Sequence, residues 1–126
     1  MNTDQKERLA HKGKMGMAAC AIRLKAARMA VGLSQKQLAD ALGLKRTTNI
    51  SNMELAQSFP NREIMAYFFS EHRIDFNFLM SGHYAQLPGD VQDALFPALV
   101  VANNEWEQRE GSDRTQASWQ HTQSQT

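Results

Sequence analysis

The chain has 126 residues, of which 42% are hydrophobic and 21% charged, enough for the core of one domain and too few for two of ordinary size. No apolar stretch approaches the roughly 18 residues that a membrane span needs, and the polar N-terminus lacks the apolar region of a signal peptide. The single cysteine, Cys20, excludes an internal disulfide. We therefore expect a cytoplasmic protein with no membrane segment.

The formal net charge of +1 conceals an uneven distribution of charge along the chain. Residues 1–60 contain ten Lys and Arg against four Asp and Glu, whereas residues 61–126 contain four against nine. A basic half followed by an acidic half suggests that the first half meets a polyanion, although small domains also acquire such asymmetry by chance. Charge alone leaves both interpretations open.

Residues 1–17 are polar, and we expect them to form a flexible basic arm with at most a short helical stretch from Asp4. Their four cations are Lys6, Arg8, Lys12 and Lys14. A folded domain is predicted over 18–83. Its first helix is indicated by apolar residues that recur on one helical face and by a glycine that stops the helix, namely Cys20, Leu24, Ala27, Val31 and Gly32.

A second helix is expected after Ser34, which stands three residues before Gln37 in the spacing of a capping box. It should end at Gly43, because a residue without a side chain permits the positive φ of a tight turn. A third helix, seated by Ile50 and Met53, follows that turn.

A fourth helix is expected after Pro60, with Ile64 and Phe68 among its apolar residues, and a fifth runs from Asp75 to Gly82. The chain has no alternating β-branched runs, no Asn-Gly hairpin turns and no internal repeat. We therefore predict an all-α fold.

Residues 84–110 predict a helical extension, in which Pro97 should kink or restart the helix. An apolar face on this extension either caps the core or forms the interface of a homodimer, and we favour the dimer. Residues 111–126 contain no Leu, Ile, Val, Phe or Met and predict a disordered tail.

The third helix should leave short polar side chains free, with two cations just before it. Amides and hydroxyls can hydrogen-bond base edges in the major groove of DNA while cations meet phosphates, so the pattern is that of a helix-turn-helix. The residues expected to face double-stranded DNA are Gln35, Lys36, Lys45, Arg46, Thr47, Thr48, Asn49, Ser51 and Asn52.

Residues from about Arg23 to Gly82 resemble the Cro/CI-type (Xre) helix-turn-helix family of phage and bacterial regulators. The resemblance rests on Arg23-Leu24-Lys25, Arg28, Gly32-Leu33-Ser34-Gln35, Leu38-Ala39, Leu42-Gly43-Leu44, Ile50, Met53-Glu54, Pro60 and the segment 76–82, in family order. It implies a compact five-helix domain like that of lambda repressor, followed here by the C-terminal helical extension.

The resemblance also implies roles for particular residues. Gln35 would contact a phosphate and brace a base-reading side chain, and Arg28 and Glu54 would form a largely buried pair. The basic arm would track the DNA backbone or an adjacent groove. Two departures are visible: six residues separate Gly43 from Ile50 where the family usually has five, and Leu55-Ala56 stands where the family commonly has a glycine.

These features predict a sequence-specific DNA-binding transcriptional regulator, a repressor that binds a palindromic operator as a homodimer. The alternative is a protein-interaction or antitoxin-like subunit that binds a partner protein through residues 84–126. The sequence shows no phosphate loop, nucleophile elbow or carboxylate pair, so we expect no enzyme. Its four histidines lack metal-ligand spacing, and we expect no metal or cofactor.

Overall fold

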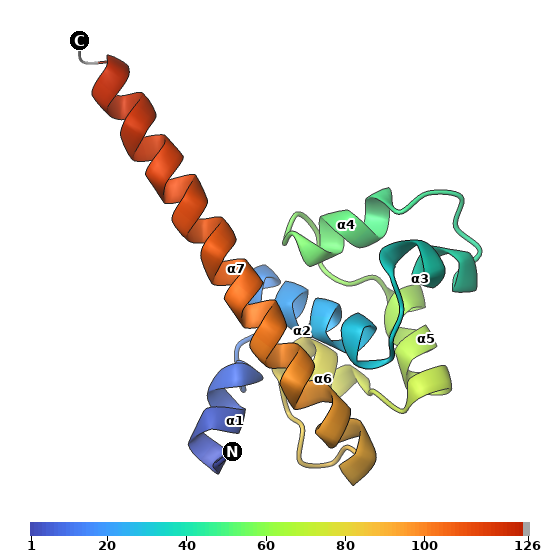
Figure 1. The fold of residues 1–126 in the computed structure, drawn as a ribbon. Helices are drawn as coiled ribbons and strands as arrows, with labels where there is room; N and C mark the ends of the chain where they lie inside the picture. Colours follow the sequence, from blue (N-terminus) through green and yellow to red (C-terminus); the bar gives the residue numbers. More distant parts are fainter. Residues whose placement is uncertain (125–126) are drawn as a thin grey trace.

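Seven α-helices make up the fold in the computed structural model of the chain, which describes the backbone of residues 1–124 and the side chains of residues 1–112. The helices, shown in Figure 1, are α1 (Thr3–Leu9), α2 (Met17–Ala30), α3 (Gln35–Ala41), α4 (Thr48–Glu54), α5 (Arg62–His72), α6 (Phe76–Ser81) and α7 (Gly89–Ser124). No strand forms within residues 1–124, which confirms the predicted all-α class. Helices α2 to α6 are the five predicted for the domain, and α1 and α7 extend it at either end.

Helix α2 lies at the centre of the fold and packs against α4, α6 and α7. Its buried apolar side chains are small apart from Ile22 and Leu24. Small side chains on several sides of one helix let the neighbouring helices approach closely. The predicted apolar face is confirmed at Cys20, Leu24 and Ala27, which are fully buried, whereas Val31 is only half-buried.

Helix α7 covers α2 with its own apolar face, formed by Val91, Leu95, Leu99 and Ala102. This face is therefore used inside the chain to cap the core. The helix continues through Pro97, so of the two predicted outcomes, a kink or a restart, the restart is excluded. The proline removes one intrahelical hydrogen bond, but Leu95 and Leu99 are buried on either side of it and hold the helix in place.

The backbone of α7 remains helical to Ser124, whereas the composition predicts a disordered tail from residue 111. This segment contains no proline. Once a helix has formed, each further residue that joins it gains a backbone hydrogen bond, so extension is easier than nucleation. Residues 125–126 of the predicted tail lie outside the described residues. Among the residues that the structure describes, no helix, not even α7, combines the length and apolar character that crossing a membrane requires.

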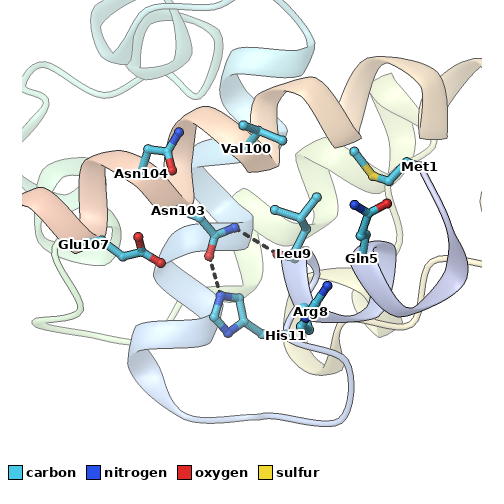
Figure 2. A pocket seen from close by; sticks show the side chains of 9 residues that line it. All are labelled: Met1, Gln5, Arg8, Leu9, His11, Val100, Asn103, Asn104 and Glu107. Carbon is cyan, nitrogen blue, oxygen red and sulfur yellow. Dashed lines mark hydrogen bonds between the residues drawn. The ribbon is translucent and has the colours of Figure 1, made fainter.

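The N-terminal segment is packed against the domain, which corrects the expectation of a flexible arm. Helix α1 begins with a capping box between Asn2 and Gln5, and Ala10 just after it is fully buried. Figure 2 shows Asn103 of α7 between two partners in this segment: its Nδ2 donates to the carbonyl of Leu9 at 3.0 Å, and its Oδ1 lies 2.6 Å from His11 Nε2. These bonds fix α1 to α7.

A buried arginine on α2 fixes the same segment from the other side. The side chain of Arg23 is fully inaccessible, and its five N–H groups donate to main-chain carbonyls. The acceptors, at 2.7–3.1 Å, are the carbonyls of Ala10, His11, Lys14, Leu79 and Met80. Burial lowers the pKa of Arg23, with the nearby Cys20 acting in the opposite direction.

Two of these acceptors belong to the last turn of α6, where carbonyls have no partner within the helix. Arg23 supplies those partners, and the negative end of the α6 dipole favours its charge. Gly82, which ends α6 at φ 78°, has no room for a side chain, since a Cβ would lie 2.4 Å from the carbonyl oxygen of Ala10. The turn after α1 and the end of α6 are thus in close contact.

We expect Arg23→Met to lower the free energy of unfolding by at least about 3 kcal/mol, because it leaves several buried carbonyls without donors. The measurement is urea unfolding followed by circular dichroism. Arg62→Met, at an exposed arginine on α5, is the matched control and should change little. Equal losses in the two variants would contradict the role given to Arg23.

Candidate nucleic-acid interface

Helix α3 has the local structure predicted for the second helix. The backbone N–H of Gln37 donates to Ser34 Oγ at 3.0 Å, and the backbone N–H of Ser34 donates to Gln37 Oε1 at 2.9 Å, which confirms the capping box. Gly43 adopts φ 72° just after the helix, as predicted. Leu38 and Ala39 are buried, so the orientation of α3 is fixed by the core.

The turn between α3 and α4 contains the additional residue. Helix α4 starts only at Thr48 and ends at Glu54, and the chain from Leu44 to Thr47 is irregular. The extra residue thus lengthens the turn, while α4 itself stays regular. Ile50 and Met53 are buried and seat α4 against α2, in agreement with the prediction.

Polar and cationic side chains gather on the outside of α3, the turn and α4. Thr48 and Asn49 are exposed on α4, and Ser51 and Asn52 are half-buried beside them, as is Thr47 before the helix. The exposed cations are Lys36, Lys45 and Arg46. Within the part of the chain whose side chains are described, none of these three cations has an ion-pair partner. Their charge is therefore available to an external anion.

Arg28 of α2 holds the end of α4 through a two-pronged contact with Glu54. Arg28 Nε donates to Glu54 Oε2 at 2.7 Å and Nη2 donates to Oε1 at 3.0 Å. The two side chains are 12% and 3% exposed, so the pair is largely withdrawn from water. Arg28 Nη1 also donates to the carbonyl of Leu33 at 2.9 Å, just before α3. One guanidinium thereby connects α2, the start of α3 and α4.

Gln35 joins this network. Its Nε2 donates to Glu54 Oε1 at 3.2 Å, and the residue is half-buried. Gln35 therefore ties the first turn of α3 to the last residue of α4. The amide contact to Glu54 was not foreseen in the sequence, which indicated a phosphate contact through the family resemblance.

The end of α4 is strained at Ala56. This residue has φ 60°, in the left-handed region where a Cβ costs about 1–2 kcal/mol. The conformation lets the backbone N–H of Gln57 donate to the carbonyl of Asn52 at 2.9 Å, which closes the helix. The conformation usual for glycine at this point of the family is thus kept, although alanine occupies it.

The N-terminal cations do not lie beside this surface. Helix α1 lies well away from α3 and α4 in Figure 1, and it packs on α7. Arg8 and His11 line a hollow of about 610 Å³ between α1 and α7, shown in Figure 2. Residues 1–17 are thus fixed on another side of the domain from α3 and α4, and their expected contact with the DNA backbone or an adjacent groove stays a prediction.

The fold and this surface define a helix-turn-helix module. A family model described as Helix-turn-helix matches residues 24–64, from within α2 to the start of α5. This match agrees with the resemblance of the segment to Cro/CI-type (Xre) helix-turn-helix regulators, and it supports a DNA-binding regulator. A search of curated proteins and a search of solved structures each gave no match.

Two residues that lie beside α4 are outside the predicted set of site residues. Trp106 and Arg109 of α7 lie beside the end of α4, where Arg109 Nη2 donates to the carbonyl of Leu55 at 3.4 Å. The sequence offered only a weak signal for them, an aromatic residue and a cation one helical turn apart on the extension. Their contact with α4 depends on the way α7 packs across α2.

Loss of Arg28 should destabilise the domain. We expect Arg28→Ala to lower the free energy of unfolding by about 3 kcal/mol, because the Glu54 carboxylate stays buried without its cation. Thermal unfolding measures the change. Lys36→Ala removes an exposed cation and should leave the Tm almost unchanged, so equal Tm values for the two variants would contradict the structural role of the pair.

Relief of the strain at Ala56 should stabilise the protein. Ala56→Gly removes the Cβ from a left-handed residue and is expected to raise the free energy of unfolding by about 1 kcal/mol in urea titrations. Ala66→Gly, at an exposed position inside α5, should lower it by a similar amount. Destabilisation by both substitutions would show that the backbone at Ala56 is not strained.

Proposed function

We propose that the protein is a sequence-specific regulator that binds double-stranded DNA, with α4 in the major groove. The observation that carries this proposal is the exposed polar face of α4 beside Lys45 and Arg46, neither of which has an ion-pair partner among residues 1–112. Thr48, Asn49 and Asn52 offer hydroxyls and amides to base edges, and the cations reach phosphates. For this role we propose a cytoplasmic location, where the protein has access to DNA.

The network around Glu54 supports this function. A base-reading helix must keep its angle to the domain, because a small rotation displaces every side chain that enters the groove. Arg28 and Gln35 hold α4 from α2 and α3 through one carboxylate. The remaining amide N–H of Gln35 and the side chain of Lys36 lie at the start of α3, where we propose that they meet the DNA backbone.

We further propose that the protein acts as a homodimeric repressor on a palindromic operator. One small module rarely provides enough specific affinity, and helix-turn-helix dimers contact half-sites about 34–36 Å apart. The buried face of α7 is already used by α2, so the dimer must use other surfaces, for which Val100 and Val101 are exposed at 36% and 41%. Repression is the simplest mechanism, since occupation of a promoter needs no contact with polymerase.

A second function is favoured by the projection of α7 beyond the rest of the fold in Figure 1. A projecting helix is available to another protein, as in an antitoxin-like subunit that binds its partner through residues 84–126. One measurement distinguishes the two functions. A DNA-binding regulator must bind duplex DNA with salt-dependent affinity, whereas the alternative predicts no such binding to any duplex.

Arg46→Ala tests the placement of the DNA surface. A preferred duplex is first selected from a random pool, which also reports the symmetry and half-site spacing. Loss of one phosphate contact should weaken binding and reduce the slope of log K against log[salt] by about 0.9. Fluorescence anisotropy at several salt concentrations measures both quantities.

Arg8→Ala is the matched control, because it removes an equal charge from an exposed site on α1, away from α4. Its affinity and salt slope should stay close to those of the unaltered protein. If Arg46→Ala binds as tightly as the unaltered protein, α4 and its preceding turn do not form the DNA surface.

A further inference from the structure

Helix α4 has few means of holding its own conformation. It has seven residues, and isolated helices of that length are unstable in water. Its N-cap, Thr47, makes no side-chain hydrogen bond to the first turn. The position of α4 therefore depends on contacts from other elements, and the contacts made by Ile50, Met53 and Glu54 all lie on its buried side.

The C-terminal end of α4 receives one more contact, from α7. Leu55 directly follows the last residue of α4, and its carbonyl oxygen has no acceptor role within the helix. Arg109 Nη2 donates to this oxygen at 3.4 Å. The positive guanidinium thus lies at the negative end of the α4 dipole, where a cation is stabilising.

The side chain of Arg109 is itself held by an aromatic ring. Its guanidinium carbon lies 4.3 Å from the centre of the Trp106 ring, a cation–π distance. Its Nε is buried and has no hydrogen-bond partner among the described residues. Stacking on Trp106 and the bond to Leu55 therefore account for the position of the guanidinium.

The turn of α7 that carries these residues is fixed to α2. Glu105 forms an ion pair with Lys25 of α2, and Ala102 is buried in the same region. Trp106 and Arg109 line a small hollow together with Ile22 of α2. The clamp, which we define as Trp106 and Arg109, is thus anchored on the same helix that supports α4.

We propose that Arg109, stacked on Trp106, is a positioning residue that holds the C-terminal end of α4 in its DNA-binding orientation. This inference rests on the proposed function for its effect on DNA, and it extends that function to a segment outside the helix-turn-helix match, which ends at residue 64. The clamp acts at the C-terminal end of α4, and the turn with Lys45 and Arg46 precedes its N-terminal end. Each end of α4 then has a role: the cations before it are placed to contact DNA, and the clamp after it holds its orientation.

Hydrogen exchange in the free protein tests the clamp without DNA. The amides of Leu55 and Gln57 donate to the carbonyls of Ser51 and Asn52 at 2.9 Å and report on the end of α4. Arg109→Ala should speed their exchange about fivefold, the range of a lost exposed cation–π contact and dipole interaction. Gln108→Ala, at the exposed neighbouring position, should leave both amides unchanged.

Binding to the selected duplex tests the consequence for DNA. Arg109→Ala should weaken binding about fivefold at every salt concentration, with the slope of log K against log[salt] unchanged. Arg109→Lys keeps the charge but loses the planar stacking surface, so it should restore only part of the affinity. Far-ultraviolet circular dichroism of each variant ensures that the comparison is between folded proteins.

Each result has a defined meaning. Unchanged exchange at Leu55 and Gln57 would overturn the clamp, whether or not DNA is bound. Faster exchange with unchanged affinity would overturn its role in positioning, and a slope reduced by about 0.9 would show that Arg109 contacts phosphate directly instead. If the unaltered protein binds no duplex, the proposed function fails, while the exchange result still decides whether α7 restrains α4.

Discussion

The buried guanidinium of Arg23 is the contact on which the arrangement of the N-terminal segment and α6 depends. It carries a positive charge into the interior with no carboxylate partner among the described side chains, and it is stabilised there by carbonyl dipoles from the turn after α1 and the end of α6. The same turn contains His11 at φ 51°, a left-handed conformation that a non-glycine residue adopts only when its surroundings enforce it. Arg23 on one side and Asn103 on the other provide that constraint.

Two arginines of α2 perform complementary tasks. Arg23 binds main-chain carbonyls and fixes the N-terminal segment and α6, whereas Arg28 binds a carboxylate and fixes α4. Planar guanidinium groups suit both tasks, since each presents several N–H donors in fixed directions. The central helix thus has an apolar surface that determines which elements surround it and two cations that determine how they are oriented.

The elements that sequence patterns predicted well are those whose signals are local. The capping box of Ser34 and Gln37 and the positive φ of Gly43 each depend on residues within one turn. Residues that close in sequence are also close in the structure, so the sequence alone predicts their contacts. The apolar periodicity of α2 predicted Leu24 and Ala27 in the core for the same reason. Proposed contacts with DNA follow from the faces that this packing leaves exposed.

The elements that were missed depend on long-range contacts. The acceptors of Arg23 are main-chain carbonyls, which carry no side-chain signal, and a lone arginine on a helix is ordinarily expected in water. Helix α1 looked like a solvated arm because its composition is polar; its packing relies on Arg23 and Asn103 rather than on a strong apolar face. The contact of Arg109 with Leu55 joins distant parts of the sequence and becomes visible only when α7 lies across α2.

The position of α7 also has a consequence for folding during synthesis on the ribosome. Helix α2 is made early, but Leu95 and Leu99, which cover one side of it, belong to the last helix. At translation rates of about 5–20 residues per second, the nascent chain spends seconds with that side of α2 uncovered. This side of the core can close only after α7 has emerged, so α2 must wait for a helix made much later in the chain.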